Sequence, residues 1–236
     1  MSIELIQGDC MDYLRDLPDN AFELAIVDPP YGIGFDGHDQ ITSNKGKGRT
    51  FKKIKLYAKK DWDSSIPSNF YFEQLRRSSV NQIIWGGNYF TNYLTQTKSW
   101  IFWDKVPNTN NLTFSDGELA WTSTKTPTRM VSIPWIGFGM LNGGGERKQH
   151  PTQKPVKLYE WLLTNYAKHG DRILDTHLGS GSNAIAAHNL GFDFVGIELD
   201  ADYYKAAKQR LENHMKQLRM FDMPLEQKAA EQVTPL

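Results

Sequence analysis

The stretch "RILDTHLGSGSNAIAAHNLGFDFVGIELD", residues 172–200, decides the fold. It reads as a buried strand, a glycine-rich turn, a helix and a second strand. Gly179 and Gly181 allow the backbone to come close to a ligand, and the following helix points its N-terminus at the same place. Glu198 closes the second strand, where a carboxylate can accept hydrogen bonds from ribose hydroxyls. The stretch therefore predicts a nucleoside-type cofactor rather than a plain structural turn.

The glycine turn alone does not identify that cofactor. Gly179, Gly181 and Ala184 also fit the G-x-G-x-x-A pattern of dinucleotide-binding units, which have an acidic residue about 20 positions further on. A nicotinamide dinucleotide and S-adenosylmethionine both remain open from these residues.

Short apolar strands alternate with helices along the rest of the chain, which favours a mostly parallel sheet covered on both faces. Strands are expected at 3–7, 22–28, 81–87, 99–105, 117–123, 128–135, 172–175 and 192–199. Helices are expected at 10–17, 69–80, 181–191 and 200–219, and one more has Pro155 in its first turn. We expect one α/β domain over residues 1–221 and a disordered polar tail over 222–236.

The composition agrees with a single intracellular domain. The chain has 236 residues, 39% of them hydrophobic, and 27 basic residues balance 27 acidic ones. A single cysteine, Cys10, rules out an intramolecular disulfide and fits a reducing compartment. The N-terminus lacks a signal-peptide pattern, and no apolar run approaches the roughly 20 residues needed to span a bilayer. We therefore expect a cytoplasmic protein.

A second stretch, "ELAIVDPPYGIGFDG" at 23–37, places an acid, two prolines and an aromatic residue at the end of a buried strand. Asp28 faces the usual ligand crevice of an α/β sheet. Pro29 and Pro30 stiffen the chain and remove two N–H donors, so that a backbone carbonyl can act as an acceptor. Tyr31 adds a flat face for stacking.

Two acceptors and a stacking surface suit an exocyclic amino group on a planar base. The carboxylate and the carbonyl would take its two hydrogens and make the nitrogen lone pair available to attack an electrophilic methyl group. A base inside a duplex would have to be flipped out to reach such a pocket. No metal is required. A stiff strand-to-loop turn is the plainer interpretation, but it does not account for the glycine turn as well.

These motifs together resemble the amino-methyltransferases that modify DNA, in particular their permuted β group. The resemblance rests on "DPPY" at 28–31, "HPTQKP" at 150–155 and "DTHLGSGS" at 175–182, in the order of that group. The segments "IIWGGNYF" at 83–90 and "SDGELAWTS" at 115–123 are similar as well. The resemblance covers nearly the whole chain. It implies a Rossmann-like methyltransferase fold with circularly permuted order, and S-adenosylmethionine as cofactor.

The resemblance also implies roles for individual residues. The catalytic residues would be Asp28, Pro29, Pro30 and Tyr31. The residues around the cofactor would be Asp9, Cys10, Asp28, Lys154, Asp175, Thr176, His177, Leu178, Gly179, Ser180, Gly181, Ser182, Glu198 and Leu199. Within this set Asp9 would lie near the adenine of the cofactor and Glu198 at its ribose.

Two positions depart from the family pattern. Thr176 and His177 stand where the family usually has Pro and Phe. His177 keeps a flat ring and can replace the packing of Phe, which we prefer. It could instead weaken cofactor binding or make that binding depend on pH. Ser182 for Thr is conservative.

The leading interpretation is a site-specific adenine N6 methyltransferase, because DPPY in this group usually accompanies adenine. A solo modification enzyme and one half of a restriction-modification pair both remain open. Cytosine N4 or RNA methylation is the near alternative. A nicotinamide-dependent oxidoreductase fits the glycine turn but leaves the segment 28–31 unexplained. An inactive DNA-binding protein, with His177 as the damaged position, is a third class.

Double-stranded DNA is the expected partner. The loop 32–61 carries a basic half that could clamp phosphates, although most charge runs are only solvated surface. The stretch 104–149 is taken as the small target-recognition insertion, and its shortness suggests a short site or a homodimer. The DNA-binding candidates are Lys45, Lys47, Arg49, Lys52, Lys53 and Lys55.

The end of the last helix carries one further resemblance. "QLRMF", Gln217 to Phe221, is similar to peptides that dock on bacterial sliding clamps. The apolar end of an amphipathic helix explains the same letters, and we prefer that interpretation.

Overall fold

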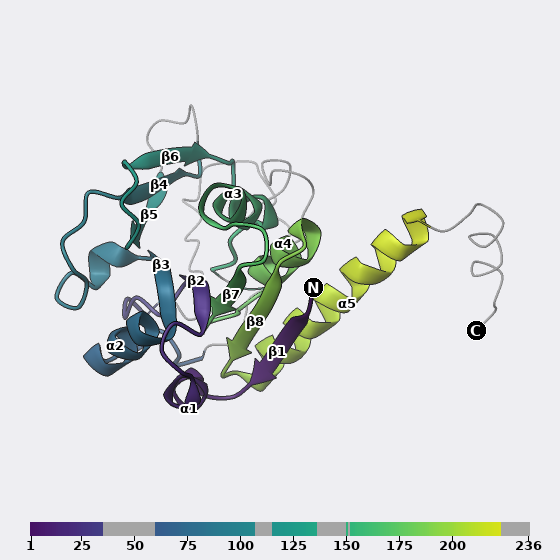
Figure 1. Ribbon diagram of the computed structural model, residues 1–236, viewed down its shortest axis with the longest axis horizontal. Coiled ribbons are helices and arrows are strands. Elements are labelled where there is room, and N and C mark those ends of the chain that lie inside the picture. Colours follow the sequence, from purple (N-terminus) through teal and green to yellow (C-terminus); the bar gives the residue numbers. More distant parts are fainter. Residues whose placement is uncertain (35–59, 107–114, 136–149, 151, 223–236) are drawn as a thin grey trace, which may run out of the picture.

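A computed structural model describes residues 1–34, 60–106, 115–135, 150 and 152–222 of the chain. Within these residues the chain forms an eight-stranded sheet with helices on both faces (Figure 1). The predicted α/β class is confirmed.

The strands are β1 (Ile3–Gln7), β2 (Phe22–Val27), β3 (Ser79–Trp85), β4 (Trp100–Asp104), β5 (Gly117–Thr122), β6 (Arg129–Ser132), β7 (Arg172–Asp175) and β8 (Asp193–Glu198). Their order across the sheet is β1-β8-β7-β2-β3-β5-β4-β6. β5 runs antiparallel to β3 and β4, and the other neighbours are parallel. The first strand in the chain lies beside the last, as a circularly permuted order requires.

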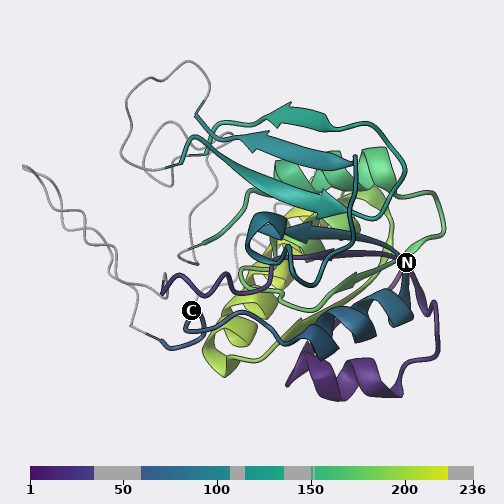
Figure 2. The same ribbon diagram turned by 90° about the vertical axis from the view of Figure 1, so that its left-hand side faces the viewer.

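The helices are α1 (Cys10–Asp16), α2 (Asn69–Ser78), α3 (Val156–Tyr166), α4 (Ser182–Leu190) and α5 (Ala201–Asp222), with a short 3-10 helix η1 (Gly87–Tyr89). Helices α1 and α2 cover one face of the sheet, and α3, α4 and α5 cover the other (Figures 1 and 2). None of the helices in the described part of the chain combines the length and apolarity that a membrane crossing needs.

Strand β2 lies in the middle of the sheet and shows why a two-sided core forms. Leu24 and Ile26 pack into the core under α3 and α4, whereas Ala25 and Val27 pack into the core under α1 and α2. All four are at most 1% exposed. Each large side chain buried in this way contributes roughly 2 kcal/mol. The continuous apolar run before Asp28 is therefore what a parallel strand covered on both faces needs.

Several element boundaries differ from the sequence prediction by one to three residues, and two of the differences have a clear local cause. Pro155 is the N-cap of α3 rather than a residue of its first turn. Helix α2 ends at Ser78, and β3 starts directly at Ser79, whose hydroxyl donates to the Leu75 carbonyl at 2.6 Å. That bond satisfies one carbonyl at the helix end and allows the chain to enter the sheet without a loop.

Part of the stretch 104–149 belongs to the sheet, because it supplies β5 and β6. Its other segments, 107–114 and 136–149, lie outside the described residues, as do the six basic DNA-binding candidates between Lys45 and Lys55. The backbone of Gln217–Phe221 continues α5.

Candidate active site

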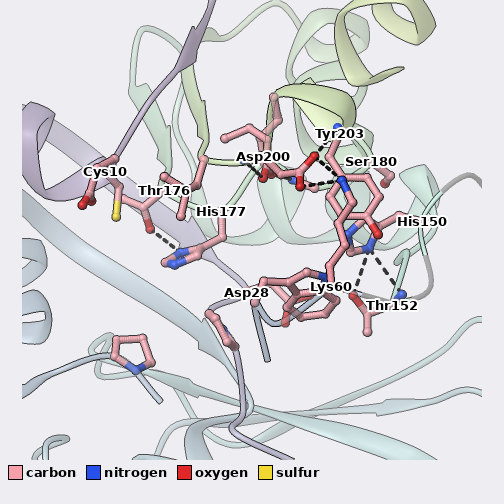
Figure 3. A pocket seen from close by; sticks show the side chains of 18 of the residues that line it. Cys10, Asp28, Lys60, His150, Thr152, Thr176, His177, Ser180, Asp200 and Tyr203 are labelled. Carbon is pink, nitrogen blue, oxygen red and sulfur yellow. Dashed lines mark hydrogen bonds and ion pairs between the residues drawn. The ribbon is translucent and has the colours of Figure 1, made fainter. Parts of the chain in front are cut away.

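A cavity of about 850 Å³ opens at the carboxyl ends of the parallel strands (Figure 3). This is the edge where ligands bind in open α/β sheets. Most of the residues singled out in the sequence line it: Asp9, Cys10, Asp28, Pro30, Lys154, Thr176, His177, Leu178, Gly179, Ser180, Ser182, Glu198 and Leu199. Pro29, Tyr31, Asp175 and Gly181 were singled out as well but are not among the lining residues. Two motifs far apart in the chain, DPPY and the glycine turn, thus meet at one cavity.

The glycine turn after β7 forms an open cradle. Gly179 has a φ of +52°, and a Cβ built on it would find no atom closer than 3.9 Å. Gly181 has a φ of +76°, and its Cβ would lie 3.2 Å from Ala207 of α5. The first glycine therefore keeps space free for a ligand, and the second brings α4 close to α5.

Glu198 fixes the turn to the end of β8. Its carboxylate accepts from the backbone N–H of Gly179 at 2.8 Å and of Asp200 at 3.0 Å. Burial raises the pKa of Glu198 and outweighs these two hydrogen bonds. The Glu198 carboxylate lines the cavity beside the open cradle at Gly179. A carboxylate next to free space can accept hydrogen bonds from the hydroxyls of a ribose.

Asp28 lies just past the end of β2 with both carboxylate oxygens engaged. Oδ1 accepts from the Tyr31 hydroxyl at 2.7 Å, and Oδ2 accepts from Lys154 Nζ at 2.5 Å. The sequence predicts a free acceptor, so this network is a finding of the structure. Burial raises the pKa of Asp28, and Lys154 works against that rise.

Lys154 is buried between two carboxylates. Its ammonium lies 3.1 Å from Glu118 Oε2, and Glu118 Oε1 accepts from Lys105 at 3.0 Å. Burial acts to lower the pKa of Lys154, but Asp28 and Glu118 raise it above its ordinary value. Burial likewise works against ionisation of Glu118, yet Lys154 and Lys105 lower its pKa to about 2. The network thus alternates acidic and basic side chains in the order Asp28, Lys154, Glu118 and Lys105.

Sequence reasoning missed Glu118 and Lys105. Glu118 comes from β5, and it reaches the site because β5 pairs with β3, which in turn pairs with β2. The available signal was an acidic residue inside an otherwise apolar strand, "GELAWT". Further residues that line the cavity and were not singled out are Lys60, Tyr71, His150 and Tyr203.

Tyr31 was expected to offer a stacking face, and its ring stacks on Tyr89. The two centroids are 4.9 Å apart with an interplanar angle of 16°. Gly86, with a φ of +68°, lies so close that a Cβ there would be 2.2 Å from the Tyr31 ring. A glycine is therefore required at position 86 if Tyr31 is to keep this place.

Asp175 supports the glycine turn from behind. Its carboxylate accepts from the backbone N–H of His177 at 3.0 Å and from the Asn183 amide at 3.0 Å. Burial nevertheless raises the pKa of Asp175 to about 7, against the effect of these two donors. Between roughly pH 4 and 7 the native protein therefore holds a proton on Asp175 that the unfolded chain releases.

Asp175→Asn is expected to alter the pH dependence of stability. With a folded pKa above the unfolded one, this carboxyl lowers the free energy of unfolding by about 1.4 kcal/mol for each pH unit between roughly pH 4 and 7. The deficit of the variant relative to the natural protein should shrink by about 2 kcal/mol between pH 5.0 and 6.5. Urea denaturation at both pH values measures the free energy of unfolding of the two proteins. A difference between them that is the same at pH 5.0 and 6.5 would refute the assignment.

Comparison with known proteins identifies the family of the chain. The family model described as "DNA methylase" matches residues 22–209. The chain belongs to the DNA methylase family. It is 25% identical to the type II methyltransferase M2.DpnII of Streptococcus pneumoniae, over 88% of this chain and 89% of that relative.

Two solved structures share the fold. The crystal structure of the M1.HpyAVI–SAM complex matches with a TM-score of 0.53 and 20% identity, over 88% of this chain and 99% of that one. The cytosine-N4-specific PvuII DNA methyltransferase matches with a TM-score of 0.55 and 14% identity, over 92% and 91%. The predicted Rossmann-like methyltransferase fold and the family assignment are thus confirmed.

Proposed function

We propose that this protein is a site-specific DNA methyltransferase that transfers a methyl group from S-adenosylmethionine to the N6 amino group of a flipped-out adenine. The observation that carries the proposal is the position of Asp28. Its carboxylate lines the same cavity as the open cradle at Gly179 and the carboxylate of Glu198. A methyl acceptor and a nucleoside cofactor can therefore lie side by side.

The residues divide the task between them. S-adenosylmethionine supplies an electrophilic methyl group, and the cradle with Glu198 would hold it. Asp28 accepts a hydrogen bond from the amino group of the base and stabilises the positive charge that develops on its nitrogen. Asp28 would also be the acceptor for the amino proton that is lost when the methyl group is transferred and S-adenosylhomocysteine is left.

Lys154 keeps Asp28 ready for this task. Burial alone would favour the protonated carboxyl, which accepts poorly, and the ammonium at 2.5 Å favours the anion. Glu118 forms a second ion pair with the Lys154 ammonium. The lysine can therefore shift toward Glu118 when an amino group binds to Asp28. Tyr31 has to leave its stack on Tyr89 if its ring is to cover the base.

The choice of adenine rests on the DPPY sequence. Cytosine N4 methylation uses the same chemistry and is the second candidate, because the PvuII enzyme, which is cytosine-N4-specific, shares the fold. The name of M2.DpnII as a type II methyltransferase supports a role in restriction-modification. Double-stranded DNA is the proposed partner, and the basic residues of the loop 32–61 are proposed to contact its phosphates. The recognition segments are proposed to be the parts of 104–149 outside β5 and β6, and a homodimer would present two copies of them to the DNA.

The deciding experiment incubates the protein with S-adenosylmethionine and unmodified genomic DNA, and then identifies the nucleosides by mass spectrometry. N6-methyladenine that appears with the natural protein and not with Asp28→Asn supports the proposal. N4-methylcytosine would keep the mechanism and refute the choice of base. No methylated base in DNA, with methylation of RNA in a parallel reaction, would refute the DNA substrate.

Gly179→Ala is expected to weaken binding of S-adenosylmethionine by about tenfold. The new Cβ enters the free space of the cradle, and the positive φ adds strain. Gly191→Ala is the matched control, because Gly191 also has a positive φ, +79°, but ends α4 and does not line the cavity. It should cost about 1 kcal/mol of stability and leave affinity unchanged. Isothermal titration calorimetry measures both, and equal affinities for the two variants would contradict the assigned role of Gly179.

A further inference from the structure

The two departures from the family pattern, Thr176 and His177, form one hydrogen-bonded unit with a residue of α2. The hydroxyls of Tyr71 and Thr176 are 2.7 Å apart, and Thr176 Oγ1 lies 2.9 Å from His177 Nδ1. The rings of Tyr71 and His177 also meet edge to face, with centroids 5.4 Å apart. A Pro–Phe pair at these positions could make neither hydrogen bond.

The Tyr71 hydroxyl indicates which groups donate and which accept in this hydrogen-bonded unit. Burial raises the pKa of Tyr71 well above its ordinary value, so its phenol keeps its proton and needs an acceptor. In the described part of the protein the hydroxyl of Tyr71 has Thr176 Oγ1 as its hydrogen-bond partner, and either oxygen can be the donor. With Tyr71 as the donor, the threonine hydroxyl is free to give its own proton to His177 Nδ1. The opposite order would leave a buried phenolic O–H without an acceptor.

With this order of donors, His177 has its Nδ1 as an acceptor and its proton on Nε2. Burial lowers the pKa of His177 to about 4, so the ring is neutral at physiological pH. This argues against pH-dependent cofactor binding through this residue. The structure records no partner for Nε2 within its described residues, and the side chain lines the cavity. A neutral ring held in one tautomer can present a single N–H donor there.

The surroundings indicate which part of a ligand this donor would meet. Thr176 and His177 lie beside Cys10, on the opposite side of the cavity from His150 and Tyr203 (Figure 3). Asp9 is the charged group that acts on His177. Its carboxylate accepts from the N–H of Met11 at 2.8 Å and has a second oxygen for a ligand. A donor and an acceptor thus stand at the same wall of the cavity.

We propose that His177 donates a hydrogen bond from Nε2 to a ring nitrogen of the adenine of S-adenosylmethionine, while Asp9 accepts from its amino group. An adenine edge offers this pair of groups, with an acceptor nitrogen next to an exocyclic amino group. The threonine–histidine pair then replaces a purely apolar ring contact by a polar one that recognises the base of the cofactor. The inference rests on the cofactor proposed above.

The test measures binding rather than turnover. The natural protein and His177→Phe, which keeps a flat ring, are titrated with S-adenosylhomocysteine and its 1-deaza, 3-deaza and 7-deaza analogues. In each analogue one ring nitrogen is replaced by C–H. The natural protein should bind one analogue about tenfold more weakly than the parent compound. His177→Phe should bind that analogue and the parent equally, because the donor is gone.

Nitrogen NMR of the natural protein tests the tautomer without any variant. The ¹⁵N-edited spectrum of His177 should show a protonated Nε2 and an unprotonated Nδ1 from pH 6 to pH 8. The opposite tautomer, or an imidazolium, would overturn the inference. Unchanged discrimination among the analogues in His177→Phe would also overturn it and leave the methyltransferase proposal intact. Failure of the natural protein to bind S-adenosylhomocysteine at all would overturn both.

Discussion

Asp28→Asn should lower kcat for methyl transfer by about 10³-fold, while the Kd for S-adenosylmethionine changes by less than about threefold. The amide keeps the shape of the side chain but loses the negative charge beside the reacting nitrogen. It also turns one of the two oxygens that now accept from Tyr31 and Lys154 into a donor. Steady-state assays with tritiated cofactor measure kcat, and calorimetry measures Kd.

Tyr31→Phe is the matched comparison for this variant. It removes the hydroxyl that donates to Asp28 at 2.7 Å but keeps the ring that stacks on Tyr89. We expect a loss of kcat near tenfold, since the carboxylate remains an anion through Lys154. A loss in Asp28→Asn no larger than that in Tyr31→Phe would mean that the charge of Asp28 is not what drives the reaction.

The features that sequence alone predicted are those encoded within a short stretch. The glycine turn after β7, the acid that closes β8 and the apolar run before Asp28 are each readable within about ten residues. Their meeting at one edge of the sheet follows from parallel pairing, which the alternation of strands and helices predicts.

The missing parts of the site come from contacts between residues distant in the chain. Tyr71 and Thr176 are 105 positions apart, and they meet because α2 packs under the end of the sheet. Glu118 reaches Lys154 through the antiparallel pairing of β5 with β3. The residue pattern of β5 predicts that it is a strand. It does not predict which strands β5 pairs with. The sequence could therefore show an acid in β5 without showing which cation it would meet.

The hydrogen bonds of Asp28 illustrate a second limit. Its position at a strand end was predicted, and its engagement with both Tyr31 and Lys154 was not. A motif identifies the groups present at a site but not how they satisfy one another before a substrate arrives. Burial makes that satisfaction obligatory, because an isolated carboxylate and an isolated ammonium are both costly inside the protein.

Lys154→Met should destabilise the protein by about 3–5 kcal/mol, because it leaves Asp28 without its cation and brings two buried carboxylates into mutual repulsion. The pKa of Asp28, already raised by burial, rises further when the lysine that opposes this is lost. The native variant then holds a proton that the unfolded chain releases, so its free energy of unfolding should fall as pH rises from 5 to 8. Urea denaturation across this range measures the effect.

Methyl transfer by the same variant should respond to pH in the opposite direction. Only the ionised Asp28 accepts from the amino group, and a higher pKa moves ionisation to higher pH, so the rising limb of the kcat profile should shift toward alkaline pH. Lys105→Met is the control, because Lys105 also lies 3.0 Å from Glu118 but has no recorded contact with Asp28. It should lose some stability and keep the natural kcat profile. If Lys105→Met moves the profile as far as Lys154→Met does, Lys154 acts through Glu118 alone. If only Lys154→Met moves it, the buried ammonium is what keeps the acceptor of the methyltransferase ionised at neutral pH.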